Sequence, residues 1–206
     1  MILQANNIAC RRGERLLFED LSFQLGSGEL LLIEGRNGCG KTTLLRTLAM
    51  LRQPDAGQVT WDGEPIEKLA ELYRQHLTWM GHHNALKADL TALENLRVAT
   101  RLHNLQCSDD DLWAALEEIG LYSYEDLPTR VLSQGQKRRA ALAFLLLTKA
   151  KLWVLDEPFS ALDVKAVDYL QSIIRKHIDN QGMVILTTHQ EVELMSDQIK
   201  RLQLDA

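Results

Sequence analysis

The chain reads Gly35-Arg36-Asn37-Gly38-Cys39-Gly40-Lys41-Thr42 between a short apolar run and a stretch with helical periodicity. The spacing of the glycines, the lysine and the threonine matches a loop that binds phosphate. Small residues let backbone N–H groups wrap around an anion, and the positive end of the following helix favours negative charge. We therefore predict that this segment binds the phosphates of a nucleotide, with a glycine-rich strand–helix turn without a ligand as the alternative.

Two side chains at the end of this segment predict how the phosphates are held. Lys41 is expected to reach the β- and γ-phosphates, and the hydroxyl of Thr42 is expected to ligate magnesium. The predicted nucleotide contacts in this region are Gly35, Arg36, Asn37, Gly38, Cys39, Gly40, Lys41, Thr42 and Thr43.

Apolar runs separated by helical patterns predict the rest of the core. Residues 30–33, 152–155 and 183–186 are apolar at every position, which is typical of strands buried on both faces. After the second run, residues 164–180 keep apolar side chains at helical spacing. The alternation of buried strands and helices indicates an α/β fold with a mostly parallel sheet covered on both sides.

The first part of the chain has a different pattern. Apolar and polar positions alternate there in stretches that are joined by glycine turns, at residues 2–9, 16–25 and 58–62. Alternation of this kind is typical of strands with one buried face. We therefore expect an antiparallel β portion beside the parallel sheet.

Helical patterns dominate between about residues 85 and 131. Thr91 and Glu94 have the spacing of a capping box, which starts a helix by satisfying backbone N–H groups at both residues. We therefore predict that a helical subdomain is inserted at about 85–131. The α/β core comprises residues 1–84 and 132–206, and the two parts together form one domain over all 206 residues.

The composition argues against several classes of function. The formal net charge is -5 and the chain has no basic tail, whereas binding to a nucleic-acid backbone requires clustered lysine and arginine. Cys10, Cys39 and Cys107 lack metal-ligand spacing, which favours a reduced, cytosolic chain. No apolar run approaches the roughly 20 residues of a membrane-spanning helix, so another chain is expected to supply any membrane crossing.

Two carboxylates, Asp156 and Glu157, end the apolar run at residues 152–155. Asp156 is expected to hold the magnesium shell, and Glu157 to polarise the attacking water. An acidic helix cap after a buried strand would use the same residue types. Because a phosphate-binding loop precedes them in the chain, the catalytic interpretation is favoured.

Two further polar segments support this interpretation only in combination. The segment Leu132-Ser133-Gln134-Gly135-Gln136 precedes a helical pattern, and Ser133 is expected to cap that helix so that its N–H groups face an approaching anion. His189 follows the predicted strand that begins at Met183, and it is expected to donate a hydrogen bond to a γ-phosphate. Alone, the pentapeptide is weak evidence against a simple capped helix, and a lone loop histidine is more often structural.

In their order along the chain, these motifs resemble those of the ABC ATPase family. Residues 35–42 are similar to Walker A, 132–136 to the signature motif and 152–157 to Walker B. Ser160-Ala161-Leu162-Asp163 is similar to the D-loop, and His189 to the switch histidine. The resemblance covers the whole chain, and the five motifs together are highly specific.

The resemblance implies an ATPase with ATP and Mg²⁺ as cofactors and with Lys41, Glu157 and His189 as catalytic residues. In the family, the signature loop of one subunit covers the nucleotide on the phosphate loop of another. This chain has one of each motif. The resemblance therefore implies a second ATP-binding subunit, in a homodimer where Ser133 and Gly135 act on the partner's nucleotide.

Two positions depart from the family pattern. The family usually carries an aromatic side chain that stacks on adenine, and this chain has Cys10-Arg11-Arg12-Gly13 there. We predict that Arg12 stacks its guanidinium plane on the base and that base selectivity is loose. The family also carries a glutamine that senses magnesium, and His83 occupies its place in Gly81-His82-His83-Asn84. His83 is predicted to reach the metal through a water, and a haem or other metal site at His82-His83 is less favoured than plain loop residues.

Four phrases point further within the family: Trp79-Met80-Gly81-His82-His83, Leu90-Thr91-Ala92-Leu93-Glu94-Asn95-Leu96, Leu152-Trp153-Val154-Leu155-Asp156-Glu157-Pro158-Phe159 and Leu186-Thr187-Thr188-His189-Gln190. They resemble the ATP-binding subunits of bacterial cytochrome c maturation systems. The resemblance implies a peripheral subunit on the cytoplasmic face of the inner membrane, bound to integral membrane subunits. Its ATP hydrolysis would drive haem handling and release a haem-loaded chaperone. An ATPase for transport of another substrate and a soluble ABC-type switch stay open as alternatives.

Overall fold

The computed structural model describes residues 1–124, 126–189 and 199–204. The last part of the predicted core, at residues 190–198 and 205–206, lies outside the described residues. The chain forms two compact units. The first unit consists of residues 1–80, 150–158 and 176–206, and the second unit of residues 81–149 and 159–175.

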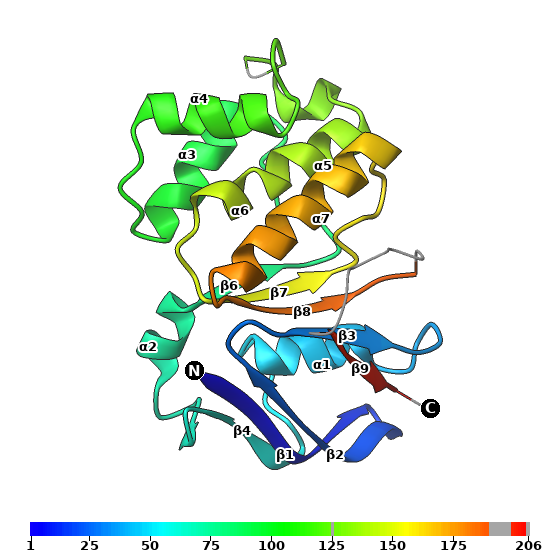
Figure 1. Ribbon diagram of the computed structural model, residues 1–206. Coiled ribbons are helices and arrows are strands. Elements are labelled where there is room, and N and C mark those ends of the chain that lie inside the picture. The colour runs from blue at the N-terminus through cyan, green and yellow to red at the C-terminus, as the bar shows by residue number, and fades with distance from the viewer. Residues whose placement is uncertain (125, 190–198, 205–206) are drawn as a thin grey trace. The chain divides into compact units, whose positions relative to one another are not determined.

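A parallel sheet belongs to the first unit, with its strands in the order β6-β7-β8-β3-β9 (Figure 1). The strands are β3 (Leu30–Glu34), β6 (Leu77–Met80), β7 (Leu152–Asp156), β8 (Met183–Thr187) and β9 (Ile199–Gln203). Every residue of β7 and β8 is buried, as expected for central strands that are covered on both faces. The predicted parallel sheet is therefore confirmed.

An antiparallel sheet with the strand order β2-β1-β4-β5 also belongs to the first unit. Its strands are β1 (Ile2–Arg12), β2 (Arg15–Gly26), β4 (Ala56–Trp61) and β5 (Glu64–Pro65). The turn between β1 and β2 contains Gly13 with a φ of 62°, a left-handed conformation that glycine adopts without a steric penalty. The antiparallel portion expected from the alternating stretches is confirmed.

The core of the first unit joins both sheets through helix α1 (Lys41–Leu48). Leu44, Leu45 and Leu48 are fully buried in α1 and belong to the same apolar cluster as residues of β1, β7 and β8. The short helix α2 (Ala70–Gln75) is fixed to α1 by Tyr73, whose buried hydroxyl donates a 2.7 Å hydrogen bond to the Leu48 carbonyl. This packing holds α1 from its middle to its last residue, and the helix begins at Lys41, where the predicted phosphate loop ends.

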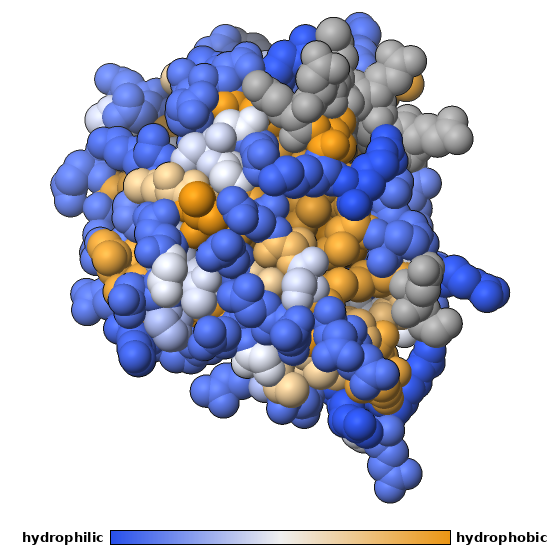
Figure 2. Space-filling view, turned by 60° about the horizontal axis from the view of Figure 1, so that its bottom comes forward, coloured by the Kyte–Doolittle hydropathy of each residue, from blue (hydrophilic) through white to orange (hydrophobic). Residues whose placement is uncertain are grey.

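The surface is mainly hydrophilic, with apolar side chains between the charged and polar ones on the face shown in Figure 2. Exposed apolar residues include Leu72 on α2 and Leu102, the last residue of helix α3 (Ala92–Leu102). Across the part of the chain that the structure describes, no helix is long and apolar enough to cross a membrane.

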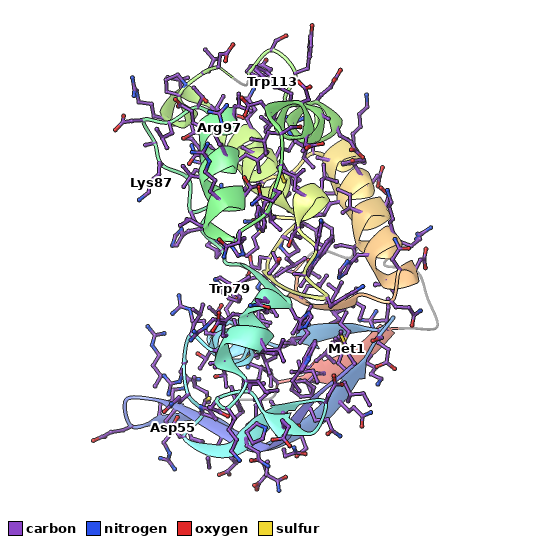
Figure 3. All side chains as sticks on the ribbon, turned by 90° about the vertical axis from the view of Figure 1, so that its left-hand side faces the viewer. Met1, Asp55, Trp79, Lys87, Arg97 and Trp113 are labelled. Atoms are coloured by element: carbon purple, nitrogen blue, oxygen red, sulfur yellow. The ribbon has the colours of Figure 1, made fainter. Side chains whose placement is uncertain are left out.

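Helices make up most of the second unit. They are α3 (Ala92–Leu102), α4 (Asp109–Glu118), the 3₁₀ turn η1 (Thr129–Val131), α5 (Gln134–Leu142), α6 (Phe144–Leu147) and the first part of α7 (Val164–Asp179). Arg97 lies on α3 and Trp113 on α4 (Figure 3). The two helices pack against each other, and α6 packs on both.

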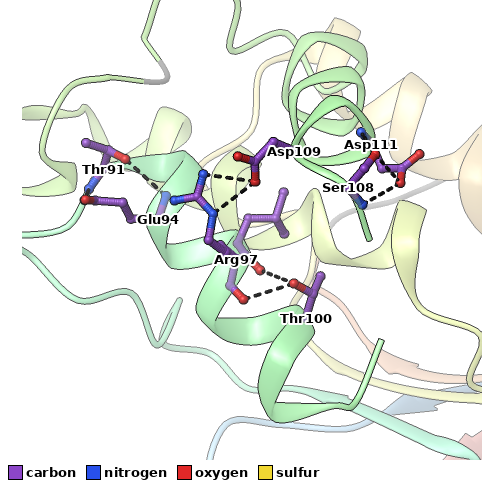
Figure 4. Close-up of polar contacts among 8 residues, drawn as sticks. Thr91, Glu94, Arg97, Thr100, Ser108, Asp109 and Asp111 are labelled. Carbon is purple, nitrogen blue, oxygen red and sulfur yellow. Dashed lines mark hydrogen bonds and ion pairs between the residues drawn. The ribbon is translucent and has the colours of Figure 1, made fainter. Parts of the chain in front are cut away.

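Capping boxes start α3, α4 and α5, as Figure 4 shows for α3 and α4. The Thr91 N–H donates to the Glu94 carboxylate over 2.8 Å, and the Glu94 N–H donates to the Thr91 hydroxyl over 3.1 Å. Each such cap stabilises a helix by about 1 kcal/mol. The capping box predicted from the sequence is confirmed, and Arg97 pairs with Asp109 across the two helices.

The second unit extends beyond the residues 85–131 that the sequence patterns suggested. Because α5 and α6 pack on α3, residues 132–149 cluster with the helices rather than with the parallel sheet. Residues 159–175 also cluster with this unit. Periodicity in the sequence locates a helix, but it carries no information on which distant helix it packs against.

Candidate nucleotide-binding site

The loop between β3 and α1 takes its shape from glycine backbone conformations. Gly40 immediately precedes α1 with a φ of 114°, in a region that L side chains rarely adopt. A Cβ on Gly40 would lie 3.1 Å from Leu17 and 3.2 Å from the Phe18 ring. At Gly35, with a φ of 145°, a Cβ would lie 2.5 Å from the carbonyl oxygen of Leu204. The glycine spacing of the motif therefore follows from backbone strain and close packing at these positions.

The Lys41 side chain folds back over this loop. Its ammonium donates to the Gly35 carbonyl over 2.6 Å and to the Arg36 carbonyl over 3.3 Å, and the residue is buried. A buried ammonium held by two carbonyls places a positive charge inside the loop, where it can neutralise a bound phosphate. The structure thus brings Lys41 to the predicted phosphate site.

Thr42 and Asp156 lie together although 114 residues separate them. The Thr42 hydroxyl donates a 2.8 Å hydrogen bond to one carboxylate oxygen of Asp156, and the Thr187 hydroxyl donates a 2.8 Å bond to the other. The Glu157 N–H in turn donates to the Thr187 hydroxyl over 3.0 Å. Asp156, only 3% exposed, is therefore oriented on both sides.

The donor set at Thr42 and Asp156 fits a magnesium ion. Mg²⁺ takes hard oxygen ligands, usually one or two from the protein, with waters and substrate phosphates completing the octahedron. A hydroxyl and a carboxylate beside a phosphate loop supply this chemistry. In the described part of the chain, no group of three or more His, Cys, Asp and Glu side chains could hold a metal, so the fit rests on the hydroxyl–carboxylate pair.

Glu157 follows β7 in a left-handed conformation, with a φ of 49°. This conformation costs a non-glycine residue about 1 kcal/mol or more, and such strain clusters at functional sites. Its carboxylate oxygen lies 3.2 Å from Nε2 of His189, whose side chain is 44% exposed. The structure therefore places the two predicted catalytic residues side by side.

A cavity of about 250 Å³ is lined by most of the predicted nucleotide contacts of the first unit, but not by Gly35, Arg36 or Cys39. It is lined by Arg12, Leu17, Asn37, Gly38, Gly40, Lys41, Thr42, Thr43 and Glu157. The wall thus combines part of the predicted phosphate loop, the carboxylate predicted to be catalytic and the arginine predicted to stack on the base. Mixed apolar and polar linings of this kind suit a small polar ligand.

The other predicted residues belong to the second unit. The Ser133 hydroxyl accepts the Gln136 N–H over 3.2 Å, and the Gln136 side chain accepts the Ser133 N–H over 2.8 Å. A Cβ on Gly135 would lie 2.9 Å from the carbonyl oxygen of Ala161, so the glycine allows α5 to approach the segment before α7. Ser133 caps α5 as predicted, while the roles of Ser133, Gly135 and His83 toward a nucleotide stay predictions.

Comparison with known protein families decides the assignment. The family described as "ABC transporter" matches residues 18–160, more than half of the chain. The chain belongs to the ABC transporter family. It is an ABC-type ATPase with a nucleotide as its ligand, and the resemblance and fold class expected from the sequence are confirmed.

Individual relatives extend this result. Cytochrome c biogenesis ATP-binding export protein CcmA of Dechloromonas aromatica is 50% identical over 203 residues, covering 98% of this chain and 100% of that protein. A putative ABC transporter ATP-binding protein from Pyrococcus furiosus has a TM-score of 0.84 at 24% identity, covering 99% of this chain and 98% of that one. A dimeric post-hydrolysis state of the ATP-binding cassette MJ0796, bound to ADP and Pi, has a TM-score of 0.83 at 21% identity, covering 99% and 97%.

Sequence reasoning missed three residues that shape this site. Thr187 holds Asp156 and the Glu157 backbone, Leu17 lines the cavity, and the Leu204 carbonyl packs on Gly35. A polar residue at the carboxyl end of an apolar strand was the available signal for Thr187. Leu17 and Leu204 look like ordinary apolar positions in the sequence and gave no signal.

Proposed function

We propose that this chain is the ATP-hydrolysing subunit of a membrane complex in cytochrome c maturation. The hydrolysis of ATP by this subunit drives haem handling and the release of a haem-loaded chaperone. The observation that carries the proposal is the 50% identity to CcmA of D. aromatica over 98% of this chain and the whole of that protein. The motifs predicted for hydrolysis lie on the chain that this match covers to 98%.

In the proposed reaction, Lys41 neutralises charge on the phosphates that the loop holds. Thr42 and Asp156 would hold Mg²⁺, which neutralises charge on the β- and γ-phosphate oxygens when bound. Glu157 orients water for attack on the γ-phosphorus and receives its proton. A bond forms between the water oxygen and phosphorus, the bond to the ADP oxygen breaks, and ADP and phosphate are released.

His189 is proposed to serve this step in two ways. Its Nε2, 3.2 Å from Glu157, orients the carboxylate toward the water. Once a nucleotide is bound, the exposed imidazole also donates a hydrogen bond to the γ-phosphate. His83 is proposed to sense the metal through a water, as a replacement for the glutamine of the family.

The proposed working unit is a homodimer. Each copy has one phosphate loop and one signature segment, and the signature residues Ser133 and Gly135 would cover the nucleotide of the partner copy. The similar fold of MJ0796 was solved as a dimer with ADP and Pi, which supports this arrangement. The dimer is proposed to bind integral membrane subunits peripherally at the cytoplasmic face of the bacterial inner membrane, with no nucleic-acid partner.

The experiment that tests the proposal uses Glu157→Gln, which removes the group that receives the proton. Isolated with ATP from detergent-solubilised membranes, this variant is expected to carry integral membrane proteins, a haem chaperone and haem absorbance. The matched control is Glu157→Gln combined with Lys41→Ala, which should lose ATP and with it the ATP-dependent partners.

Three outcomes separate the alternatives. Haem-handling membrane proteins with haem support the maturation function. Different membrane proteins without haem would keep the ATPase but assign it to another transport substrate. A protein without membrane partners would contradict the proposal and favour a soluble switch.

A further inference from the structure

A second cavity, of about 250 Å³, is lined by residues of the second unit. The end of α4, the helix α5 and the start of α7 contribute to its wall, and we call it the α5–α7 cavity (Figure 1). Arg139 and Leu142 are three residues apart on α5, and Ala166 and Tyr169 are three residues apart on α7, so each pair lies on one face of its helix. Among the described residues, none lines both this cavity and the nucleotide cavity.

Apolar side chains make up much of the wall of the α5–α7 cavity. Ile119 and Leu142 are buried, and Leu162 and Ala166 are half-buried. Pockets for drug-sized ligands begin at about 300 Å³, so a cavity of about 250 Å³ suits a smaller molecule. Because the burial of apolar surface is the main favourable contribution in such a pocket, the molecule that fits it has an apolar body.

The guanidinium of Arg139 has donors left for a ligand. Nη1 donates to the Gly120 carbonyl over 3.4 Å, and Nη2 lies 4.0 Å from one carboxylate oxygen of Asp163. Both distances are long, since strong contacts of a guanidinium measure about 2.7–2.9 Å. The other carboxylate oxygen of Asp163 accepts the Ala166 N–H over 2.9 Å at the start of α7. Arg139 can therefore bind a ligand carboxylate in a bidentate manner while Asp163 keeps its role in α7.

The hydroxyl of Tyr169, which also lines the cavity, lacks a partner. It is buried, and no group in the described part of the chain meets it with the length and angle of a hydrogen bond. Burial and the neighbouring carboxylate of Glu118 raise the pKa of this hydroxyl, so it keeps its proton at neutral pH. A buried hydroxyl without a partner costs free energy, and a polar group of a ligand beside it would remove that cost.

The charges around the cavity limit the charge of the ligand. Two cations, Arg139 and Lys165, are matched by two carboxylates, Glu118 and Asp163. A ligand with several negative charges, such as a nucleotide or a polyphosphate, would meet both carboxylates without a surplus of cations. A single carboxylate can pair with Arg139 alone. Because Glu118 would repel a second carboxylate near Tyr169, the group that suits the Tyr169 hydroxyl is a neutral hydroxyl, which can donate and accept.

We propose that the α5–α7 cavity binds a small amphipathic acid with one carboxylate, an apolar body and one hydroxyl group. The carboxylate pairs with Arg139, the body packs against Ile119, Leu142 and Leu162, and the hydroxyl forms a hydrogen bond with Tyr169. This binding requires neither a nucleotide nor a second copy of the chain. The inference therefore stands independently of the proposed function.

The probe for this site is para-hydroxyphenylacetate, which carries all three groups. We expect calorimetric titration of the purified chain with saturating ADP to give a Kd of about 1 mM or lower. ADP fills the nucleotide cavity and so prevents the probe from binding there. Phenylacetamide, which lacks the negative charge, should bind at least ten-fold more weakly, and phenylacetate, which lacks the hydroxyl, about five-fold more weakly.

Four variants of the chain locate the binding. Arg139→Gln should weaken the probe at least ten-fold, whereas Arg175→Gln is the matched control, since Arg175 is an exposed arginine of α7 outside the cavity wall. In Tyr169→Phe, para-hydroxyphenylacetate and phenylacetate should bind equally, because the partner of the ligand hydroxyl is gone. Ala166→Leu fills the cavity and should abolish binding of both acids. Thermal unfolding shows whether each variant keeps its fold, and if Ala166→Leu does not, Arg139→Gln and Tyr169→Phe decide the test.

Three results would each overturn the inference. They are no binding of para-hydroxyphenylacetate at about ten times the expected Kd, equal binding of phenylacetamide, and binding that Arg139→Gln leaves unchanged. Because ATP hydrolysis plays no part in these titrations, a chain without the proposed function can still bind the probe. Conversely, a chain that hydrolyses ATP as proposed but fails to bind the probe would lose only the α5–α7 site.

Discussion

The Thr42 hydroxyl donates a 2.8 Å hydrogen bond to the carboxylate of Asp156, and so joins the first turn of α1 to the end of β7. The two groups are far apart in the sequence but meet here because β3 and β7 are parallel strands of one sheet, whose carboxyl ends lie at the same edge. Thr187, at the end of β8 between these two strands, donates a hydrogen bond to the other carboxylate oxygen of Asp156. A hydroxyl and a carboxylate at this edge have the composition of a magnesium site.

Thr42→Ala should therefore impair magnesium-dependent turnover, while Thr42→Ser should not. Alanine removes the hydroxyl from the metal site, and we expect kcat/KM for ATP to fall by about 10- to 100-fold, the range typical of lost metal-site groups. Serine keeps the hydroxyl and serves as the control. The measurement is ATPase rate against magnesium concentration, and equal magnesium dependence for Thr42→Ala and the unchanged chain would contradict the role of Thr42.

Local patterns predicted much of this site and its fold. The strand–loop–helix order around Lys41, the two carboxylates after an apolar strand and the capping boxes are all encoded within a few residues, where periodicity and backbone preferences act. The parallel sheet followed because fully apolar strands must be covered on both faces.

Contacts between distant segments escaped prediction. Thr187 reaches Asp156 across two adjacent strands, 31 residues apart in sequence, and the Leu204 carbonyl meets Gly35 from the far end of the chain. The packing of α5 on α3, which changes the boundary of the helical unit, is of the same kind. Such contacts depend on tertiary packing, which a single sequence does not record in its local spacing.

Arg12 should contribute to nucleotide affinity without selecting the base. It lines the same cavity as the phosphate loop, and a guanidinium can stack on any purine. We expect comparable turnover of ATP and GTP, and an increase of about five-fold in KM for both nucleotides in Arg12→Ala, equivalent to roughly 1 kcal/mol. Arg15→Ala is the control, because Arg15 is the Cα partner of Arg12 across the hairpin. Strict ATP preference that Arg12→Ala leaves unchanged would refute this prediction.

His177 should make the stability of the protein fall in mild acid. Burial lowers the pKa of its imidazole to about 4, below the ordinary value of about 6.5 in the unfolded chain. Between these two values the unfolded chain binds more protons than the folded one, so stability is full above pH 6.5 and is lost as the pH falls toward 4. Because the ring is partly exposed, we expect a loss of only about 1–2 kcal/mol.

His177→Phe isolates this contribution. The ring of His177 stacks on Trp153 with centroids 3.8 Å apart and planes inclined by 8°, and phenylalanine keeps an aromatic ring there but cannot titrate. The free energy of unfolding, measured by denaturant titration from pH 7 to pH 4, should decrease less steeply in His177→Phe than in the unchanged chain. Parallel curves for the two proteins would show that His177 is not the titrating group.

The same ring makes a glycine necessary at position 182. A Cβ added to Gly182 would fall on the imidazole of His177, which cannot move away freely because it is stacked on Trp153 and its Nε2 lies 3.2 Å from the Lys151 carbonyl. The obstacle is the ring rather than the backbone, since Gly182 is not among the glycines with positive φ. Gly182→Ala should therefore lower the free energy of unfolding by about 1–3 kcal/mol, the usual cost of overpacking. In the double variant with His177→Ala, the methyl group occupies space that the ring has left, so the two losses should be clearly less than additive. Full additivity would mean that Gly182 is required for another reason.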